Sequence, residues 1–459
     1  MIRRVPAWAR VAVAAAAVAM TSCGGKRGKR GTAAAPDAGA LTPEAVAPAG
    51  PPTASGLPAA LEPGVPPAAR EWKATVLPFK GLARDAAFGT SVAAAGDVLV
   101  VGAPGAPFVD GVIGSAHVFE RHDGVWRATA RLTPPRPHRG FGDAVALSGD
   151  RIAVSSHDGV VELFERTGAR WRATASLTLP SSGDIEYSPA LALDGDTLAV
   201  GLSDWMERGK AEGRVVLYGR DAAGAWTERA RLAASDAAAR SASGESPNFG
   251  WAVALDGDEL SVTARQASCE SGTEMCGAVH LFRRSGDTWT EELALPRAEL
   301  RRWAMLGVHL AAAGGDQALF CDGEQRAWML RHGAAGWTET GTLELPAGAR
   351  DPKHGHAIAV RGGLAVISSY AMAGTARPPV IPGTNEIDTA AMAAQRGSAG
   401  GALHVFARTP SAWAFLTTLT WPDDVAGSEL GTSVAITGDT LIAGAPRAQS
   451  TGAVVVFSP

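Results

Sequence analysis

The chain lacks both an excess of basic residues and an apolar run long enough to cross a membrane. It contains 42 Lys and Arg against 46 Asp and Glu in 459 residues, and the basic residues form no stripe along the sequence. This distribution argues against a nucleic-acid partner, which needs a concentrated positive surface. The apolar run Val11–Met20 is about half the length that a membrane-spanning helix needs. The sequence therefore predicts neither a nucleic-acid-binding surface nor a spanning helix in this run.

The short apolar run has the features of an export signal instead. Arg3, Arg4 and Arg10 precede it, and residues 1–22 together predict a signal peptide that is removed. The run ends in Met20-Thr21-Ser22-Cys23, which resembles the lipobox of bacterial lipoproteins, although Met20 stands where Leu is usual. The resemblance implies lipidation of Cys23 and attachment to a membrane through acyl chains. The alternative is an ordinary secretory signal with an incidental Cys.

The segment that follows contains no aromatic residue. Residues 24–70 are dominated by Ala, Pro, Gly and Thr. Such a composition cannot bury enough apolar surface to offset the entropy of ordering, so residues 23–70 are predicted to be a lipidated Cys followed by a disordered tether. In a bacterium with two membranes, Gly24 replaces the Asp that lipoproteins use for inner-membrane retention. We therefore expect a lipid-anchored protein of the cell envelope, at the outer membrane, facing the periplasm or the surface.

Tyr is scarce and Trp is frequent, with 3 Tyr against 13 Trp, and the Trp residues recur with a period. The unit Phe88–Pro134 opens with FGTSVAAAGD, continues with VLVVGAP, and ends with SAHVF and VWRATARLTP. The Gly-Asp pair predicts a hairpin, and the alternation of Trp126, Ala128, Ala130 and Leu132 predicts a strand with one buried face. Four strands in about 45 residues is the size of one propeller blade.

The opening of this unit occurs seven times along the chain. The openings start at Phe88, Phe141, Tyr187, Phe249, Leu306, His354 and Leu430, and the fourth-strand Trp residues are Trp72, Trp126, Trp171, Trp226, Trp289, Trp337 and Trp413. Trp72 precedes the first opening, whereas the last unit ends after its third strand. Residues 71–459 therefore predict an all-β, seven-bladed β-propeller of four-stranded blades, closed when the N-terminal strand EWKATVLPF completes the last blade.

The repeat resembles the FG-GAP repeat of the integrin alpha β-propeller and its bacterial relatives. Phe88-Gly89 with Gly102-Ala103-Pro104 in the first unit, and Gly431 with Gly444-Ala445-Pro446 in the last, match it best. In that family the first hairpin often carries a calcium loop, DxDxDG. Here it is reduced to short turns such as Asp194-Gly195-Asp196, which offer too few oxygen ligands, so we predict no metal site and no cofactor.

The two faces of the predicted disc differ in the length of their connections. Because strands alternate in direction, the hairpins 1–2 and 3–4 lie on one side, here called the hairpin face. The connections between strands two and three and between blades lie on the other side, here called the loop face. All long connections fall on the loop face, at Ala103–Gly114, Ser203–Gly213, Ala264–Gly277 and Tyr370–Gly401. Trp and Arg are enriched at binding hot spots, so the candidate partner-binding residues there are Trp205, Arg208, Arg301, Trp303 and Trp421. Alternatively, each merely packs its own loop.

The remaining reactive residues suggest structural roles. Cys269 and Cys276 are spaced for a disulfide, and Cys321 is left as a single thiol of the fifth blade. His354-Gly355-His356 has the spacing of a metal-ligand pair, yet His354 occupies the position of Phe88 in the repeat. The sequence contains no Ser/His/Asp elbow, phosphate loop or isolated carboxylate pair, so we assign no catalytic residue.

These features predict a non-catalytic, monomeric lipoprotein that binds an envelope or extracellular protein or glycan through its loop face, in adhesion, scaffolding or assembly. The first alternative is an extracytoplasmic enzyme acting on polysaccharide or another envelope polymer, with acid and base groups near the propeller axis. The second is a structural spacer without a small ligand.

Overall fold

Seven four-stranded antiparallel sheets make up the part of the chain that the structure describes. The computed structural model describes residues 71–77, 79–105, 113–180, 189–207, 210–235, 248–268, 276–295, 306–321, 326–334, 336–346, 357–370, 401–410, 412–421 and 428–459. All of them belong to one unit, Arg70–Pro459. The predicted signal peptide, the tether and most of the insert at 370–401 lie outside the described residues.

Each sheet is one blade, and in the first six blades the strands follow one another in sequence. Blade 1 contains β2 (Val92–Ala95), β3 (Val98–Ala103), β4 (Ser115–His122) and β5 (Val125–Leu132). Blade 2 contains β6 (Val145–Ser148), β7 (Arg151–Ser155), β8 (Val160–Thr167) and β9 (Arg170–Thr178). Blade 3 contains β10 (Ala190–Asp194), β11 (Thr197–Leu202), β14 (Arg214–Arg220) and β15 (Trp226–Leu232), with a small hairpin of β12 (Met206–Glu207) and β13 (Lys210–Ala211) between its second and third strands.

The remaining blades repeat this order. Blade 4 contains β16 (Phe249–Asp256), β17 (Glu259–Ala264), β18 (Ala278–Ser285) and β19 (Thr288–Leu295). Blade 5 contains β20 (Leu306–Ala313), β21 (Asp316–Cys321), β22 (Arg326–Gly333) and β23 (Gly336–Glu344). Blade 6 contains β24 (Ile358–Arg361), β25 (Leu364–Tyr370), β26 (Gly401–Arg408) and β27 (Trp413–Thr420). Blade 7 contains β28 (Val434–Thr437), β29 (Thr440–Ala445), the 3₁₀ turn η2 (Ala448–Ser450) and β30 (Ala453–Ser458).

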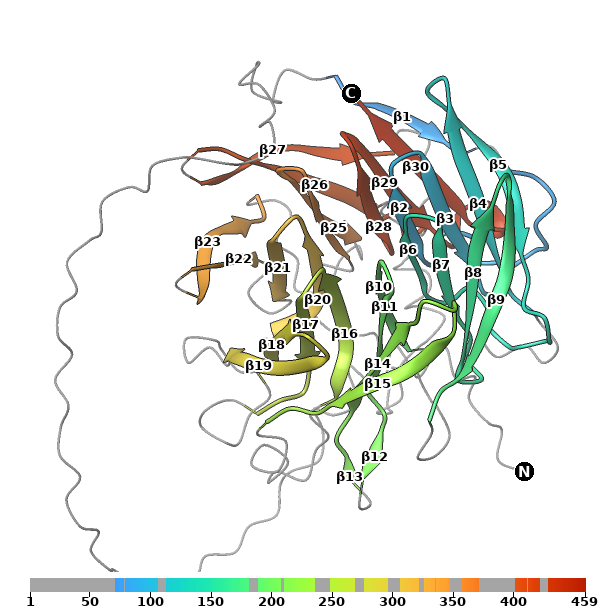
Figure 1. Ribbon diagram of the computed structural model, residues 1–459. Helices are drawn as coiled ribbons and strands as arrows, with labels where there is room; N and C mark the ends of the chain where they lie inside the picture. Colours follow the sequence, from blue (N-terminus) through green and yellow to red (C-terminus); the bar gives the residue numbers. More distant parts are fainter. Residues whose placement is uncertain are drawn as a thin grey trace, which may run out of the picture. The chain divides into compact units, whose positions relative to one another are not determined.

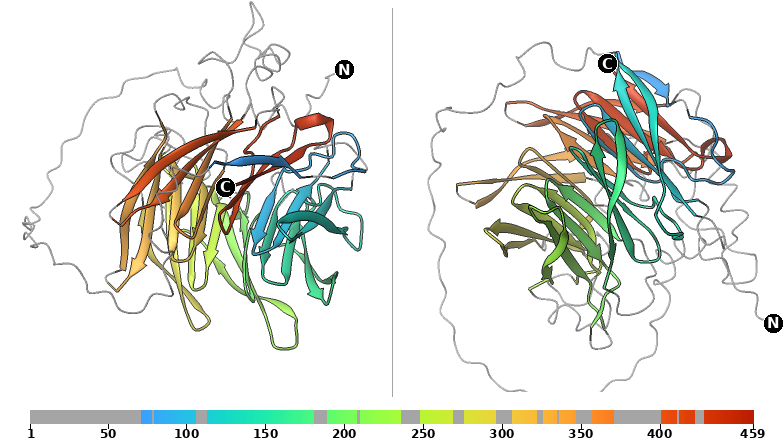
Figure 2. Two further views of the ribbon diagram at one scale, coloured as in Figure 1. Left: turned by 90° about the horizontal axis from the view of Figure 1, so that it is seen from above. Right: turned by 45° about the vertical axis from the view of Figure 1, so that its right-hand side comes forward.

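The N-terminal strand β1 (Lys73–Val76) completes blade 7. It pairs antiparallel with β30, with Lys73 opposite Ser458 and Val76 opposite Val455, and Figure 1 shows the blue strand lying beside the red one. The first strands of successive blades contact one another around a closed ring, from β2 through β6, β10, β16, β20, β24 and β28 back to β2 (Figures 1 and 2). The predicted seven-bladed β-propeller and its closure by the N-terminal strand are confirmed.

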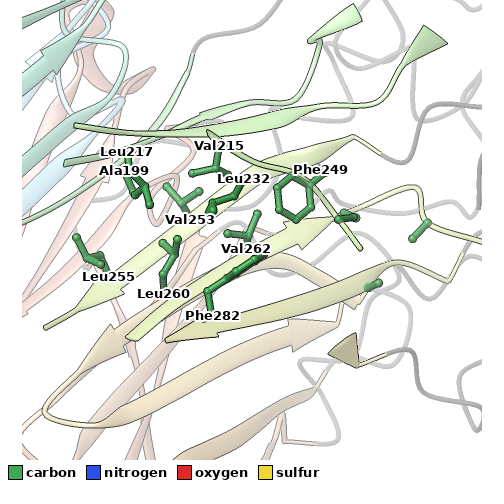
Figure 3. Packing of buried hydrophobic residues seen from close by; sticks show 14 residues of the cluster. Ala199, Val215, Leu217, Leu232, Phe249, Val253, Leu255, Leu260, Val262 and Phe282 are labelled. Atoms are coloured by element: carbon green, nitrogen blue, oxygen red, sulfur yellow. The ribbon is translucent and has the colours of Figure 1, made fainter. Parts of the chain in front are cut away.

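The hydrophobic core is divided among the interfaces between neighbouring blades. Seven clusters of buried residues fill the seven interfaces, and each cluster draws side chains from two adjacent sheets. Figure 3 shows one of them, in which Leu217 and Leu232 of blade 3 face Val253 and Phe282 of blade 4. Neighbouring blades cover both faces of the inner strands, so a third strand such as β4 is buried almost throughout. In an outer strand such as β5, exposed residues lie between the buried ones.

The glycines of the repeat allow the backbones of neighbouring blades to touch. A Cβ at Gly102 of blade 1 would lie 1.9 Å from the carbonyl oxygen of Gly142 in blade 2. Blades 7 and 1 meet in the same way, because a Cβ at Gly444 would lie 1.9 Å from the carbonyl oxygen of Gly89. Gly89 itself has a φ of +93°, which favours glycine. The glycines of the repeat therefore lie where neighbouring blades are too close for any side chain larger than a hydrogen atom.

Candidate functional site

The hairpin face is occupied by ion pairs and hydrogen bonds within the protein. Arg121 and Arg284 each lie one residue before the end of a third strand, and their Nε atoms donate to Asp97 at 2.8 Å and to Asp258 at 2.6 Å. The same guanidinium groups lie over Trp126 and Trp289, 5.4 and 5.5 Å from the ring centroids. This arrangement explains why an Arg and a Trp recur at this position of the repeat.

The short Asp-Gly-Asp turns connect neighbouring blades. Asp194 of blade 3 accepts a hydrogen bond from the backbone N–H of Gly257 in blade 4 at 2.7 Å. Asp256 accepts in the same way from Gly315 of blade 5 at 2.6 Å. The first carboxylate of each turn thus holds the next hairpin, a role that the sequence did not reveal. Among the described residues, no group of three or more His, Cys, Asp or Glu side chains could hold a metal ion.

The loop face contains a cavity of about 410 Å³ at the start of blade 1. One wall is the connection from β1 to β2, with Phe79, Leu82 and the residues between Lys80 and Ala86. The opposite wall comes from the second-to-third-strand connection and from β4 and β5, through Gly105, Ile113, Ser115, His117 and Arg131. The connection is held at Asp85 and Ala86, because the N–H of Asp85 donates to the carbonyl oxygen of Ser450 at 2.7 Å and that of Gly105 donates to the carbonyl oxygen of Ala86 at 2.9 Å.

His117 is one of two buried polar residues that line this cavity, with Ser115. It is 2% exposed, and its Nε2 lies 2.9 Å from Oγ of Ser115, two residues earlier on the same face of β4. Its Nδ1 is buried without a hydrogen-bond partner in the described part of the chain. Burial, and secondly the charge of Arg131 on the neighbouring strand, lower the pKa of His117 to about 4. The imidazole is therefore neutral at pH 7.

The pairing of Ser115 with His117 does not form a catalytic triad. No carboxylate among the described residues contacts Nδ1, which a nucleophile-activating His needs for orientation, and a pKa of about 4 makes the ring a weak base. Blade 6 contains a similar pair, since Nε2 of His404 lies 2.8 Å from Oγ of Ser369. There, however, Nδ1 lies 3.0 Å from the hydroxyl of Thr418. The Ser–His contact thus occurs in two blades with the Ser on different strands, β4 in blade 1 and β25 in blade 6, and His117 differs from His404 in its unpaired Nδ1.

The structure places two of the five partner-binding candidates. Trp205 is half-buried on the loop face of blade 3, where its ring packs against the core and Arg231 lies 5.8 Å from the ring centroid. Trp421 is 4% exposed and belongs to the cluster between blades 6 and 7, so its ring packs in the core instead of facing a partner. It follows β27 directly and closes the edge of that cluster. Arg208, Arg301 and Trp303 lie outside the described residues.

Other predicted features fall partly outside the described residues. Cys276 is buried, but Cys269 is not described, so their pairing stays a prediction. Cys321 ends β21, and nothing is described of its side chain. Cys23, His354 and His356 are also outside the described residues. Within the described ranges, no helix is long and apolar enough to span a membrane.

Sequence reasoning missed His117 and the connection that covers it. His117, His280 and His404 occupy one position of the third strand, and all three are buried. In the sequence these residues indicate only where the third strand of each repeat lies. With Glu162 of blade 2, four polar residues stand at a position that is apolar in the other blades, and this was the available signal.

These observations define the chain as a seven-bladed β-propeller. The FG-GAP repeat matches residues 80–119, 226–282 and 413–457, which include most of blade 1, parts of blades 3, 4 and 6, and blade 7 without β1. These three stretches of the propeller are therefore similar to the FG-GAP repeat.

Comparisons with other known proteins give only distant similarities. No curated protein sequence matches the chain. Among solved structures, Saccharomyces cerevisiae Sqt1 is 11% identical with a TM-score of 0.45, over 80% of this chain and 82% of that one. U3-55K is 11% identical with a TM-score of 0.48, over 84% of this chain and 98% of that one. The WD40 repeats of RRP9 are 11% identical with a TM-score of 0.47, over 83% and 96%.

Proposed function

We propose that this protein is a non-catalytic binding protein of the bacterial cell envelope, whose propeller holds a protein or glycan partner on its loop face. Cys23 carries the lipid anchor, residues 24–70 act as a spacer, and the propeller works as a monomer. The placement at the outer membrane rests on the sequence around Cys23 alone.

The cavity on the loop face is the observation that supports the proposal most. It combines a polar floor with an exposed apolar residue, Ile113, which is 47% exposed. On the hairpin face several charged side chains are already paired with one another. Rigid scaffolds generally carry their binding residues on irregular connections such as these.

The proposal is tested by capture from envelope extract with two matched variants of blade 1. Ile113→Asp places a charge on the loop face, and Val125→Asp places the same charge on the hairpin face, where Val125 is 51% exposed. We expect the first variant to lose a partner that the second retains. Equal capture by both variants would show that the binding surface lies elsewhere. No capture by the unsubstituted protein would favour the enzyme or spacer alternatives.

The anchor is tested separately by fractionation. Cys23→Ala should move the protein from the membrane fraction to the soluble fraction, because the acyl chains supply the attachment. Membrane association that survives this substitution would refute the lipid anchor.

A further inference from the structure

The cavity of blade 1 is surrounded by cations that have no acidic partner in the described part of the chain. Lys80, Arg84 and Arg131 line it, and Asp85 is the one acidic residue that does so. Among the described residues, no carboxylate lies within ion-pair distance of any of the three cations. The hairpin face shows the opposite arrangement, since Arg121 and Arg284 are paired there. The cavity therefore offers uncompensated positive charge on a protein that is acidic overall.

The apolar wall of the cavity is held in place by aromatic packing. The ring of Phe79 is stacked on Phe88, with centroids 5.4 Å apart, and meets the edge of His117 at 4.5 Å. Leu82 and Ile113 complete the wall. A preformed apolar wall favours an apolar side chain, because little conformational entropy is lost on binding.

The buried part of the cavity offers few polar groups to a sugar, since the other polar side chains of the lining are exposed. A bound sugar ring would need hydrogen-bond partners for several hydroxyl groups, whereas the buried polar side chains here are Ser115 and His117. One atom of these two side chains, Nδ1 of His117, has no hydrogen-bond partner among the described residues. A peptide can satisfy a single such atom with one backbone or side-chain group.

We propose that this cavity binds an acidic peptide segment of a partner protein, with an apolar side chain against Phe79, Leu82 and Ile113 and a carboxylate at the three cations. The inference rests on the proposed function, because it names the kind of partner that the loop face receives. A volume of about 410 Å³ accommodates a short stretch of such a segment rather than a folded domain.

The test is fluorescence anisotropy with residues 71–459, which contain all seven blades and the closing strand. The probe is a labelled, acetylated hexapeptide with five glutamates and one leucine. The comparison peptides replace all glutamates by glutamine, or the leucine by serine, and oligogalacturonate serves as an acidic glycan. We expect the acidic leucine peptide to bind most tightly, with an affinity that falls as salt is added.

The variants separate the cavity from general electrostatics. Lys80→Gln and Arg131→Gln should each weaken binding about twofold to fivefold, as expected for loss of one exposed charge pair. Arg127→Gln is the matched control, because Arg127 is an exposed cation of the same strand, β5, that does not line the cavity. It should leave the affinity unchanged.

Three results would overturn the inference: no saturable peptide binding below about 1 mM, equal effects of Arg127→Gln and Arg131→Gln, or tighter binding of oligogalacturonate than of the peptide. If one of them occurs while Ile113→Asp still abolishes capture from envelope extract, the proposed function stands and only the acidic-peptide inference falls.

Discussion

Replacing one glycine of the repeat should separate two blades by a predictable amount. The Cβ of Gly102→Ala would lie 1.9 Å from the carbonyl oxygen of Gly142 and 2.3 Å from Oγ of Ser91, whereas ordinary contacts begin near 3.4 Å. Blades 1 and 2 must therefore move apart locally by about 1.5 Å, which weakens the packing of the cluster between them.

The expected loss of stability follows from two contributions. Overpacking of a close-packed interior costs about 1 to 3 kcal/mol. The 3.0 Å hydrogen bond from Ser91 Oγ to the carbonyl of Gly142 would also be strained or lost, at about 1 kcal/mol. We therefore expect Gly102→Ala to lower the free energy of unfolding by about 2 to 4 kcal/mol, measured by urea denaturation followed through Trp fluorescence.

The control is Gly333→Ala, the same substitution in the third strand of blade 5. No neighbouring atom lies within 4 Å of the position that a Cβ would take at Gly333, and its φ is not positive. Its replacement should therefore change the free energy of unfolding by no more than about 0.5 kcal/mol. If Gly102→Ala were as mild as this control, the explanation of the repeat glycines as contact points between blades would be refuted.

Three further predictions concern closure, the hairpin face and pH. Deleting 71–79 removes the outer strand of blade 7, so the protein should unfold or oligomerise in size-exclusion chromatography with light scattering. Asp256→Ala should lower the free energy of unfolding by about 1 to 2 kcal/mol, because the N–H of Gly315 loses its charged acceptor. His117 has a pKa of about 4 in the folded protein against 6.5 when unfolded, so its contribution to stability is fully present above pH 6.5 and is lost as the pH falls to about 4. The loss amounts to about 3 kcal/mol, and His117→Val should remove it from denaturation curves recorded across this range.

Each of these predictions has a contradicting result. A well-folded monomer after the deletion would refute closure by β1. An Asp256→Ala variant no less stable than Asp287→Ala, a change at an exposed neighbouring turn, would show that the contact between blades 4 and 5 contributes nothing. Equal pH dependence of stability in the His117→Val variant and the unsubstituted protein would show that another group causes the loss of stability.

The architecture could be predicted from the sequence because it depends on local sequence patterns. Phe88, Phe141 and Phe249 recur with their glycines, and all three are fully buried between blades. The Trp residues mark the start of the fourth strand in each repeat. Because Trp72 precedes the first repeat, its strand could be assigned to the last blade. Each of these signals depends on strand periodicity and turn chemistry, which act over a few residues.

The candidate site could not be predicted in the same way, because it depends on contacts between distant segments. The cavity exists only because the connection after β1 folds over blade 1 and is held by Ser450 of blade 7. Trp421 looked like a loop residue because it follows a strand, yet neighbouring blades bury it. The carboxylate of Asp256 looked like a turn residue, and its partner lies 59 positions away.

The most direct test of the proposed binding surface is amide hydrogen exchange of residues 71–459, alone and with the partner captured from envelope extract. We expect slower exchange on binding in the connection around the cavity, at Gly81–Ala86, and at Gly105, Ser115 and His117 on the opposite wall. Slower exchange confined to the turns of the hairpin face, such as Asp97 and Asp258, would contradict the account.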